Sequence, residues 1–277
     1  MVVVGGGHSM LCTRPDALVI DLKHSRTFSQ VKIVRNNRQH DEEEKKSNGN
    51  CSDNNSSSPL VIEMGGGANL GQIASALKGS GCSVPIGTHP TVGAGLVLQG
   101  GKGFLTRRFG LTIDAIVGAQ IVDATGKIWN VSEQDDAKNG ESENEDLSFR
   151  RDLLWALKGA GNQIGGVVTK IQLKAYPVEE VWMERMLLRI SSVESLGRHL
   201  AAAWKLALEI PREHTLTIIV TNLKATNHEF NLFFAYTKVI VNDGTGGGDD
   251  DGLSPFKEES LCADSAVDGR SEEHTSE

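Results

Sequence analysis

The residues with the clearest chemical potential are Gly5, Gly6, Gly7 and His8, which are followed by Ser9. Glycine lacks a Cβ atom, so a run of glycines lets backbone N–H groups come close to a ligand and adopts positive φ without strain. Successive backbone N–H groups in such a turn form a concave site for an anion. We therefore expect a loop that holds an anionic group, with the His8 imidazole at its edge.

Two other glycine-rich stretches differ from the standard phosphate-binding patterns. The dinucleotide-binding pattern G-x-G-x-x-G is met at Gly65 and Gly67, but its third glycine is replaced by Leu70. The P-loop pattern G-x-x-x-x-G-K-[ST] is met only at Gly101-Lys102, because a leucine stands first and a glycine last. The sequence therefore argues against a Rossmann dinucleotide site and against a P-loop nucleotide site.

Residues 87–110 mix glycines with large apolar side chains. The apolar residues are Leu96, Val97, Leu98, Phe104, Leu105 and Phe109. A flexible linker is the alternative interpretation, but such linkers are rich in glycine and serine and lack large apolar residues. We expect an ordered loop that packs against the body of the domain while its backbone approaches a ligand.

The elements that position these loops are predicted from hydrophobic periodicity and from turn residues. Strands are expected at residues 18–22, 31–34, 60–64, 115–122, 128–131 and 167–174, the fourth and fifth forming a hairpin. A helix is expected from Leu70 to Leu77, with Asn69 and Gln72 as a capping box. A second, short helix is expected at residues 152–157.

The composition changes after Pro177, which indicates a second domain from residue 179. Its strands are expected at residues 183–190, 216–220 and 230–234, with a helix that begins after a capping box of Ser191 and Glu194. This pattern predicts an antiparallel sheet covered by a helix. The polar stretches 36–58 and 133–149 are expected to be low-complexity insertions, 242–252 an acidic loop, and the tail disordered.

Composition and charge exclude several classes of function. A net charge of −8 disfavours nucleic acid and anionic membranes as partners. No apolar run is long enough to span a membrane, and the four cysteines lack the spacing of metal ligands. We expect no membrane span and no metal site, and the compartment stays open.

Several segments occur in the order typical of the FAD-linked oxidases of the vanillyl-alcohol oxidase type, and the chain resembles this family over most of residues 5–177. These segments are GGGHS at 5–9, VIDL at 19–22, PTVGAGLVLQGGKGFLTRRFGLTIDAI at 90–116 and DLLWALKGAG…GVVT at 152–169. The berberine-bridge and oligosaccharide oxidases are the most similar branch. The resemblance implies an α+β fold: a two-subdomain FAD-binding domain of the PCMH type at residues 1–178, then the start of a substrate domain at 179–277.

The resemblance also gives roles to individual residues. Gly5, Gly6 and Gly7 would hold the pyrophosphate or the isoalloxazine edge of FAD, and His8 matches the histidine that bonds covalently to the flavin 8α-methyl group. The other implied cofactor-binding residues are Ser9, Pro90, Thr91, Val92, Gly93, Gly100, Gly101, Gly103, Asp114, Gly166, Val167 and Val168. His89 stands where doubly tethered relatives have cysteine, so the resemblance implies a single covalent link through His8.

By the same resemblance, hydride would pass from an alcohol, sugar or amine carbon to flavin N5, and O₂ would reoxidise the flavin. The catalytic base is not identified, because neither Tyr176 nor Tyr236 aligns with the family's usual tyrosine. The family also has a strand–helix–strand unit before the GGGHS loop and a longer substrate domain. We therefore expect a truncated chain whose first strand, at residues 1–4, has no partner. The alternative is a non-catalytic flavin-binding remnant or a truncated product without activity.

Overall fold

The computed structural model describes residues 2–9, 15–35, 60–133, 145–161, 163–224 and 229–241. The predicted insertion at 36–58 and acidic loop at 242–252 lie outside these residues, as does the tail. The chain divides into two compact units, Met1–Pro177 and Val178–Glu277. Both contain helices and strands, in agreement with the predicted α+β class.

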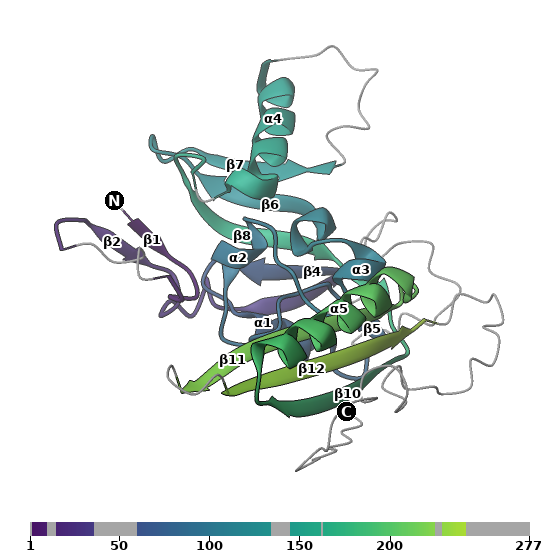
Figure 1. The fold of residues 1–277 in the computed structure, drawn as a ribbon. Coiled ribbons are helices and arrows are strands. Elements are labelled where there is room, and N and C mark those ends of the chain that lie inside the picture. The colour runs from purple at the N-terminus through teal and green to yellow at the C-terminus, as the bar shows by residue number, and fades with distance from the viewer. Residues whose placement is uncertain are drawn as a thin grey trace. The chain divides into compact units, whose positions relative to one another are not determined.

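A five-stranded antiparallel sheet forms the centre of the first unit (Figure 1). Its strands, in spatial order, are β3 (Val31–Arg35), β4 (Leu60–Gly65), β8 (Val167–Lys174), β6 (Ile116–Val122) and β7 (Ile128–Ser132). In β8, Ile171 and Leu173 are buried while Lys170 and Gln172 are half-buried, as alternation along a strand requires. The predicted hairpin is confirmed, since β6 and β7 pair from Gly118–Ser132 to Val122–Ile128.

Helix α1 (Leu70–Leu77) packs against the apolar face of this sheet. The predicted capping box is confirmed: Gln72 N donates to Asn69 Oδ1 at 3.0 Å, and Asn69 N donates to Gln72 Oε1 at 2.9 Å. Leu70, Ile73 and Leu77 are buried and join a core cluster with residues of β4 and β8. Two one-turn helices, α2 (Ala94–Val97) and α3 (Thr106–Phe109), and the 3₁₀ helix η2 (Thr112–Ala115) lie between β5 (Cys82–Ser83) and β6.

Helix α4 spans Glu145–Ala160, so the prediction of a helix at 152–157 after an insertion reaching residue 149 was too short. The added turns carry Phe149, whose ring lies 4.6 Å from the ring of Trp129 on β7. Leu154 and Leu157 are buried on the same helix, and the helical conformation ends at Lys158 and Gly159. This packing against the hairpin orders a polar sequence whose composition alone indicated a loop.

The first strand has a partner, contrary to the expectation of an unpaired edge. β1 (Val2–Val4) pairs in parallel with β2 (Val19–Asp21), in the register Val2–Val19 to Val4–Asp21. Leu22 N then donates to Val4 O at 3.0 Å. A parallel partner that returns after 14 residues leaves no local pattern in the sequence, which is why the pairing was missed. A second small pair joins β5 to β9 (Tyr176–Pro177).

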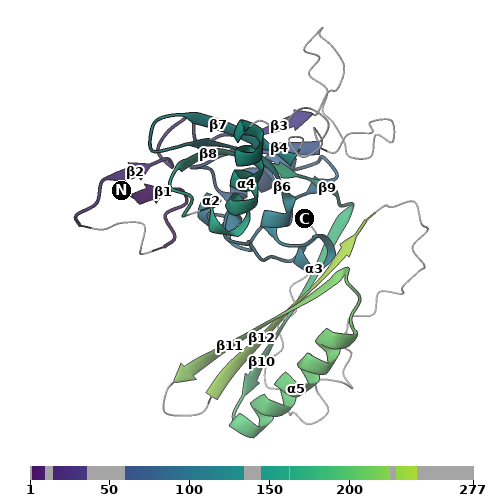
Figure 2. The same ribbon diagram turned by 90° about the horizontal axis from the view of Figure 1, so that it is seen from above.

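The second unit is a three-stranded antiparallel sheet with one helix, as predicted (Figure 2). Its elements are β10 (Glu180–Ile190), α5 (Val193–Glu209), β11 (His214–Lys224) and β12 (Glu229–Ile240), and β12 is the central strand. Leu232 and Phe234 point to the side covered by α5 and are fully buried with Ala203. The helix cap is Ser192 rather than Ser191, because Ser192 Oγ accepts from Ser195 N at 3.1 Å.

Candidate functional site

The N-terminal glycine loop meets two other glycine segments that are far away in the sequence. A Cβ built on Gly5 would lie 2.9 Å from Gly66 O, and one built on Gly6 would lie 2.9 Å from Gly93 Cα. These neighbours are backbone atoms, which cannot rotate away as a side chain can. Gly5 and Gly6 therefore have to be glycines for the three loops to come together.

The backbone N–H groups of this loop are available to a ligand. Within the described part of the chain, no carbonyl accepts a hydrogen bond from the N–H of Gly5, Gly6 or Gly7. Gly5 and Gly6 are half-buried, Gly7 is exposed, and Gly7 has a φ of 72°. Unpaired N–H groups on a loop of this kind suit an anion, and anion binding by this loop stays a prediction.

The loop at Gly65–Gly67 belongs to the same cluster, although the sequence assigned it no role once the dinucleotide pattern had failed. Gly66 N donates to Thr169 O at 2.9 Å, and a Cβ on Gly66 would overlap Val168 O. Gly67 N donates to Phe28 O at 2.8 Å. The signal for these residues was available: a third glycine run that directly follows a buried strand.

His8 lies at the edge of the cluster beside the second predicted loop. Its Nε2 atom is 2.5 Å from Thr91 Oγ1, and Thr91 Oγ1 is 3.0 Å from His89 Nδ1. The two imidazole rings are 5.4 Å apart in an edge-on arrangement. The side chains of all three residues are exposed.

The loop that carries Thr91 is held by the start of helix α1. Gly71 N donates to Pro90 O at 2.8 Å, and Leu70 N donates to Val92 O at 2.9 Å. These two N–H groups belong to the first turn of α1, where no partner within the helix exists. The helix end thus fixes residues 90–93 opposite the N-terminal loop.

The glycines at 100, 101 and 103 form a separate contact with the 85–87 segment and η2. Thr112 N donates to Gly101 O at 2.9 Å, and a Cβ on Gly101 would overlap the Thr112 side chain. A Cβ on Gly103 would overlap Ile86 O. Gly100 and Gly101 also have positive φ values of 143° and 75°. These glycines are required by contacts between chain segments, and helix α2 connects them to Gly93.

The contacts of Asp114 and Gly166 are with segments other than the N-terminal glycine loop. Asp114 Oδ2 accepts from Leu111 N at 2.7 Å, so this carboxylate caps the 3₁₀ helix η2. A Cβ on Gly166 would lie 2.8 Å from Val122 O, at the turn end of the β6–β7 hairpin, and Val167 pairs with Val122. Of the 166–168 segment, Val168 is the residue that reaches the glycine loops.

Two titratable groups near these loops have shifted pKa values. A hydrogen bond from His24 lowers the pKa of Asp21, whose Oδ2 lies 2.8 Å from His24 Nδ1 at the end of β2. Partial burial raises the pKa of Tyr176, and the nearby negative charge of Asp114 adds to this. The Tyr176 ring stacks on Phe109 with centroids 4.7 Å apart. Both shifts are explained by local structure, so neither identifies a catalytic base.

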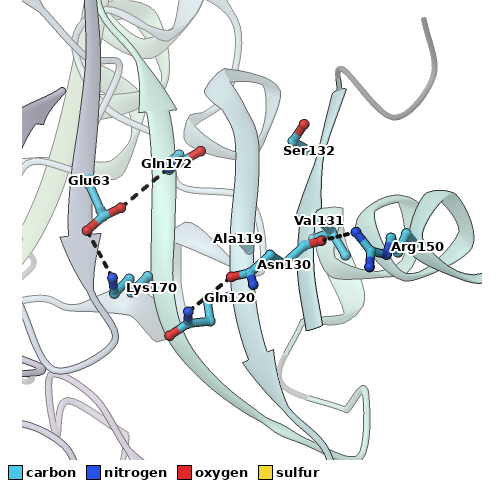
Figure 3. A pocket seen from close by; sticks show the side chains of 9 residues that line it. All are labelled: Glu63, Ala119, Gln120, Asn130, Val131, Ser132, Arg150, Lys170 and Gln172. Carbon is cyan, nitrogen blue, oxygen red and sulfur yellow. Dashed lines mark hydrogen bonds and ion pairs between the residues drawn. The ribbon is translucent and has the colours of Figure 1, made fainter. Parts of the chain in front are cut away.

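A polar hollow of about 270 Å³ lies on the opposite, hydrophilic face of the five-stranded sheet (Figure 3). It is lined by Glu63, Ala119, Gln120, Asn130, Val131, Ser132, Arg150, Lys170 and Gln172. Its polar groups satisfy one another: Lys170 Nζ is 3.4 Å from Glu63 Oε1, and Gln120 Nε2 donates to Asn130 Oδ1 at 3.0 Å. None of the predicted cofactor residues lines it. We assign this hollow no role in the site.

The described residues contain neither a cluster of metal ligands nor a helix suited to cross a membrane. No three His, Cys, Asp or Glu side chains among them gather to hold a metal ion. No helix in the described ranges is long and apolar enough to cross a membrane.

Comparisons with known proteins match this chain to an FAD-binding domain and to oxidases. Residues 50–132 match the FAD binding domain family. The chain is 34% identical over 135 residues to (R)-6-hydroxynicotine oxidase of Paenarthrobacter nicotinovorans. The match covers 48% of this chain and 26% of that protein. It is 32% identical over 174 residues to glucooligosaccharide oxidase of Sarocladium strictum, covering 61% of this chain and 31% of that protein.

Solved structures show the same fold. Wild-type BBE-like 1 of Physcomitrella patens superposes with a TM-score of 0.66 at 23% identity, over 99% of this chain and 49% of that one. The 6-hydroxy-D-nicotine oxidase of Arthrobacter nicotinovorans gives a TM-score of 0.63 at 25% identity, over 87% of this chain and 45% of that one. The chain thus spans less than a third of these two curated relatives and about half of these two structures.

Proposed function

Because the chain is a homologue of the vanillyl-alcohol oxidase type of flavoproteins and carries an FAD-binding domain, we propose that it holds FAD at the cluster of glycine loops around His8. The observation that carries this proposal is that Gly5 and Gly6, with unpaired N–H groups, pack against Gly66 and Gly93 without room for a Cβ. Gly66 and Gly93 lie within the matched domain, and the N-terminal loop completes the cluster from outside it. The N–H groups of Gly5–Gly7 would bind an anionic or carbonyl oxygen of the cofactor.

The attachment we propose is a single covalent bond between His8 and the flavin. His8 lies at the edge of the loop with an exposed imidazole, and its Nε2 atom forms a hydrogen bond with Thr91 Oγ1. A fold neighbour, glucooligosaccharide oxidase of Acremonium strictum, is described as having a novel flavinylation. The position that would supply a second, cysteinyl link is His89 in this chain.

The reaction we propose is oxidation of an alcohol, sugar or amine carbon, with hydride transfer to flavin N5 and reoxidation by O₂. The relatives named above include oxidases of a 6-hydroxynicotine and of glucooligosaccharides. In such enzymes the cofactor carries the redox chemistry, and the protein binds, orients and tunes it. The residues of this chain would therefore contribute the phosphate and ring contacts and the tether.

The second unit is proposed as the substrate domain, with the sheet face not covered by α5 as its binding surface. Along β12, Asn231 and Thr237 point away from Leu232 and Phe234, which pack against α5. Asn231 Oδ1 and Thr237 Oγ1 are buried and have no hydrogen-bond partner among the described residues. Buried polar atoms normally have a partner, so a polar ligand on this face would satisfy them.

The test is to express the chain, supply FAD and precipitate the protein with acid. A covalent link gives a yellow, fluorescent pellet that His8→Ala abolishes. His24→Ala is the matched control, because His24 is an exposed histidine that forms a hydrogen bond with Asp21 rather than with a residue of the glycine loops. A colourless wild-type pellet from protein that binds FAD would overturn the tether, and wild-type protein that binds no FAD would overturn the whole proposal.

The proposed reaction has its own test. Sugars, alcohols and amines are mixed without oxygen with the FAD-loaded protein, and bleaching of the flavin absorbance is followed before and after air is admitted. Bleaching by one class followed by recovery in air supports the oxidase. Bound flavin that no class reduces would support the alternative of a non-catalytic flavin-binding protein.

A further inference from the structure

His8, Thr91 and His89 form a continuous hydrogen-bonded chain. Thr91 Oγ1 lies within hydrogen-bond distance of both His8 Nε2 and His89 Nδ1, at 2.5 and 3.0 Å. A hydroxyl group has a single proton, so when that proton is used in this chain Thr91 donates to one of these nitrogens and accepts from the other. The protonation of the two histidines is therefore linked through Thr91.

Two neutral arrangements satisfy both hydrogen bonds and also use the Thr91 proton in one of them. In one, His8 Nε2–H donates to Thr91, and Thr91 donates to His89 Nδ1, so both histidines carry their proton on Nε2. In the other, both carry it on Nδ1. Free histidine favours the Nε2–H tautomer, and the first arrangement has two such tautomers. The first arrangement is therefore the more stable one.

The first arrangement leaves one nitrogen of His8 free to form a bond. Its Nδ1 atom then holds a lone pair, and the described residues offer that atom no hydrogen-bond donor. We propose that Thr91 and His89 are positioning residues that hold His8 in the Nε2–H tautomer and make Nδ1 its bond-forming atom. The proposal rests on the proposed function, because it concerns how His8 becomes joined to the flavin.

The same chain of hydrogen bonds removes the proton that bond formation displaces. When the Nδ1 lone pair bonds to the 8α carbon, Nε2–H passes its proton to Thr91 as Thr91 passes its own to His89. His89, which then carries a proton on each ring nitrogen, releases one to solvent. Overall, His8 and the flavin methyl group lose one proton each, and the flavin ring takes up the two electrons of the new bond with two protons from solvent. O₂, the oxidant of the proposed function, then takes both as H₂O₂.

The first test reads the tautomers in the chain without flavin. Histidine side chains labelled with ¹⁵N give different Nδ1 and Nε2 shifts for the two tautomers in a multiple-bond correlation spectrum at a pH where the rings are neutral. We expect the Nε2–H pattern at His8 and His89, a change at both in Thr91→Val, its restoration in Thr91→Ser, and no change at His24. An Nδ1–H pattern at His8, or a His8 spectrum that Thr91→Val leaves unaltered, would overturn the proposal.

The second test measures how fast acid-stable flavin forms after FAD is added. A positioned proton acceptor typically raises a reaction rate about 10²–10⁴-fold. We therefore expect Thr91→Val and His89→Ala to slow the attachment of flavin at least tenfold. Thr91→Ser and His24→Ala should attach flavin at the wild-type rate. All these side chains are exposed, so the variants are expected to fold.

The outcomes separate the two proposals. If Thr91→Val and His89→Ala attach flavin at the wild-type rate, the positioning role is overturned and the His8 tether still stands. Failure of the wild-type chain to attach any flavin, with the predicted tautomers present, overturns the tether and leaves the hydrogen-bonded arrangement standing.

Discussion

Replacing Gly6 with alanine would test whether the contact between the N-terminal loop and Gly93 is needed for cofactor binding. The added Cβ would lie 2.9 Å from Gly93 Cα and 3.2 Å from Val92 C, and it would overlap Gly93 N. All three are backbone atoms, so the clash is relieved only by separating the loops. Overpacking of this kind costs about 1–3 kcal/mol, which corresponds to about a 5- to 150-fold change in an equilibrium constant.

The assay combines the flavin content of the acid pellet with urea unfolding of the purified variant. Gly6→Ala is expected to lower the unfolding free energy of the first unit by about 1–3 kcal/mol. It should also reduce FAD occupancy at limiting FAD. The loss of affinity follows because the N–H groups of Gly5–Gly7 move away from Gly93.

Gly197→Ala is the matched control, since Gly197 lies inside helix α5 and a Cβ there would meet nothing within 4 Å. Alanine in a helix interior favours the helix over glycine by about 0.8–1.0 kcal/mol of free energy. This variant should therefore be slightly more stable than wild type and bind FAD equally well. A Gly6→Ala protein with wild-type flavin content and wild-type stability would refute the close contact between the two loops.

Three further predictions concern the elements around the site. Asn69→Ala removes the cap of α1 and should cost about 0.5–2 kcal/mol in urea unfolding, while Gln72→Ala removes the reciprocal bond and should cost less. Asp123 has its pKa lowered to about 2, because its carboxylate accepts from the Thr125 side chain and from Trp129 Nε1. The lowered folded-state pKa means that the ionised group stabilises the hairpin above the ordinary value of 3.8. This contribution should fade as the pH falls from 3.8 toward about 2, which acid titration followed by Trp129 fluorescence would detect in wild type and not in Asp123→Asn. Thr237→Val removes a buried hydroxyl that lacks a partner among the described residues, and should stabilise the second unit by about 1 kcal/mol; a loss of stability would show that the hydroxyl is bonded.

Local interactions made much of the fold predictable from the sequence. The capping box of Asn69 and Gln72, the hairpin turn at residues 123–127 and the alternation in β8 each depend on neighbours a few residues away. The order of the glycine loops indicated the resemblance to FAD-linked oxidases, because each of those loops is a contiguous motif in the sequence. The resemblance also placed Thr91 among the predicted cofactor residues.

Tertiary structure decided which of these motifs meet and what each residue touches. The strand partner of Val2–Val4, the early start of α4 and the role of Gly65–Gly67 depend on contacts between segments that are distant in the chain. The same is true of His8, whose neighbour Thr91 lies 83 positions away. Residue types and short spacings set local conformation, whereas the approach of Gly6 to Gly93 is set by how the sheet and α1 pack. The sequence by itself therefore predicted the cofactor class and the candidate tether, and only the folded chain brought His8 together with Thr91 and His89.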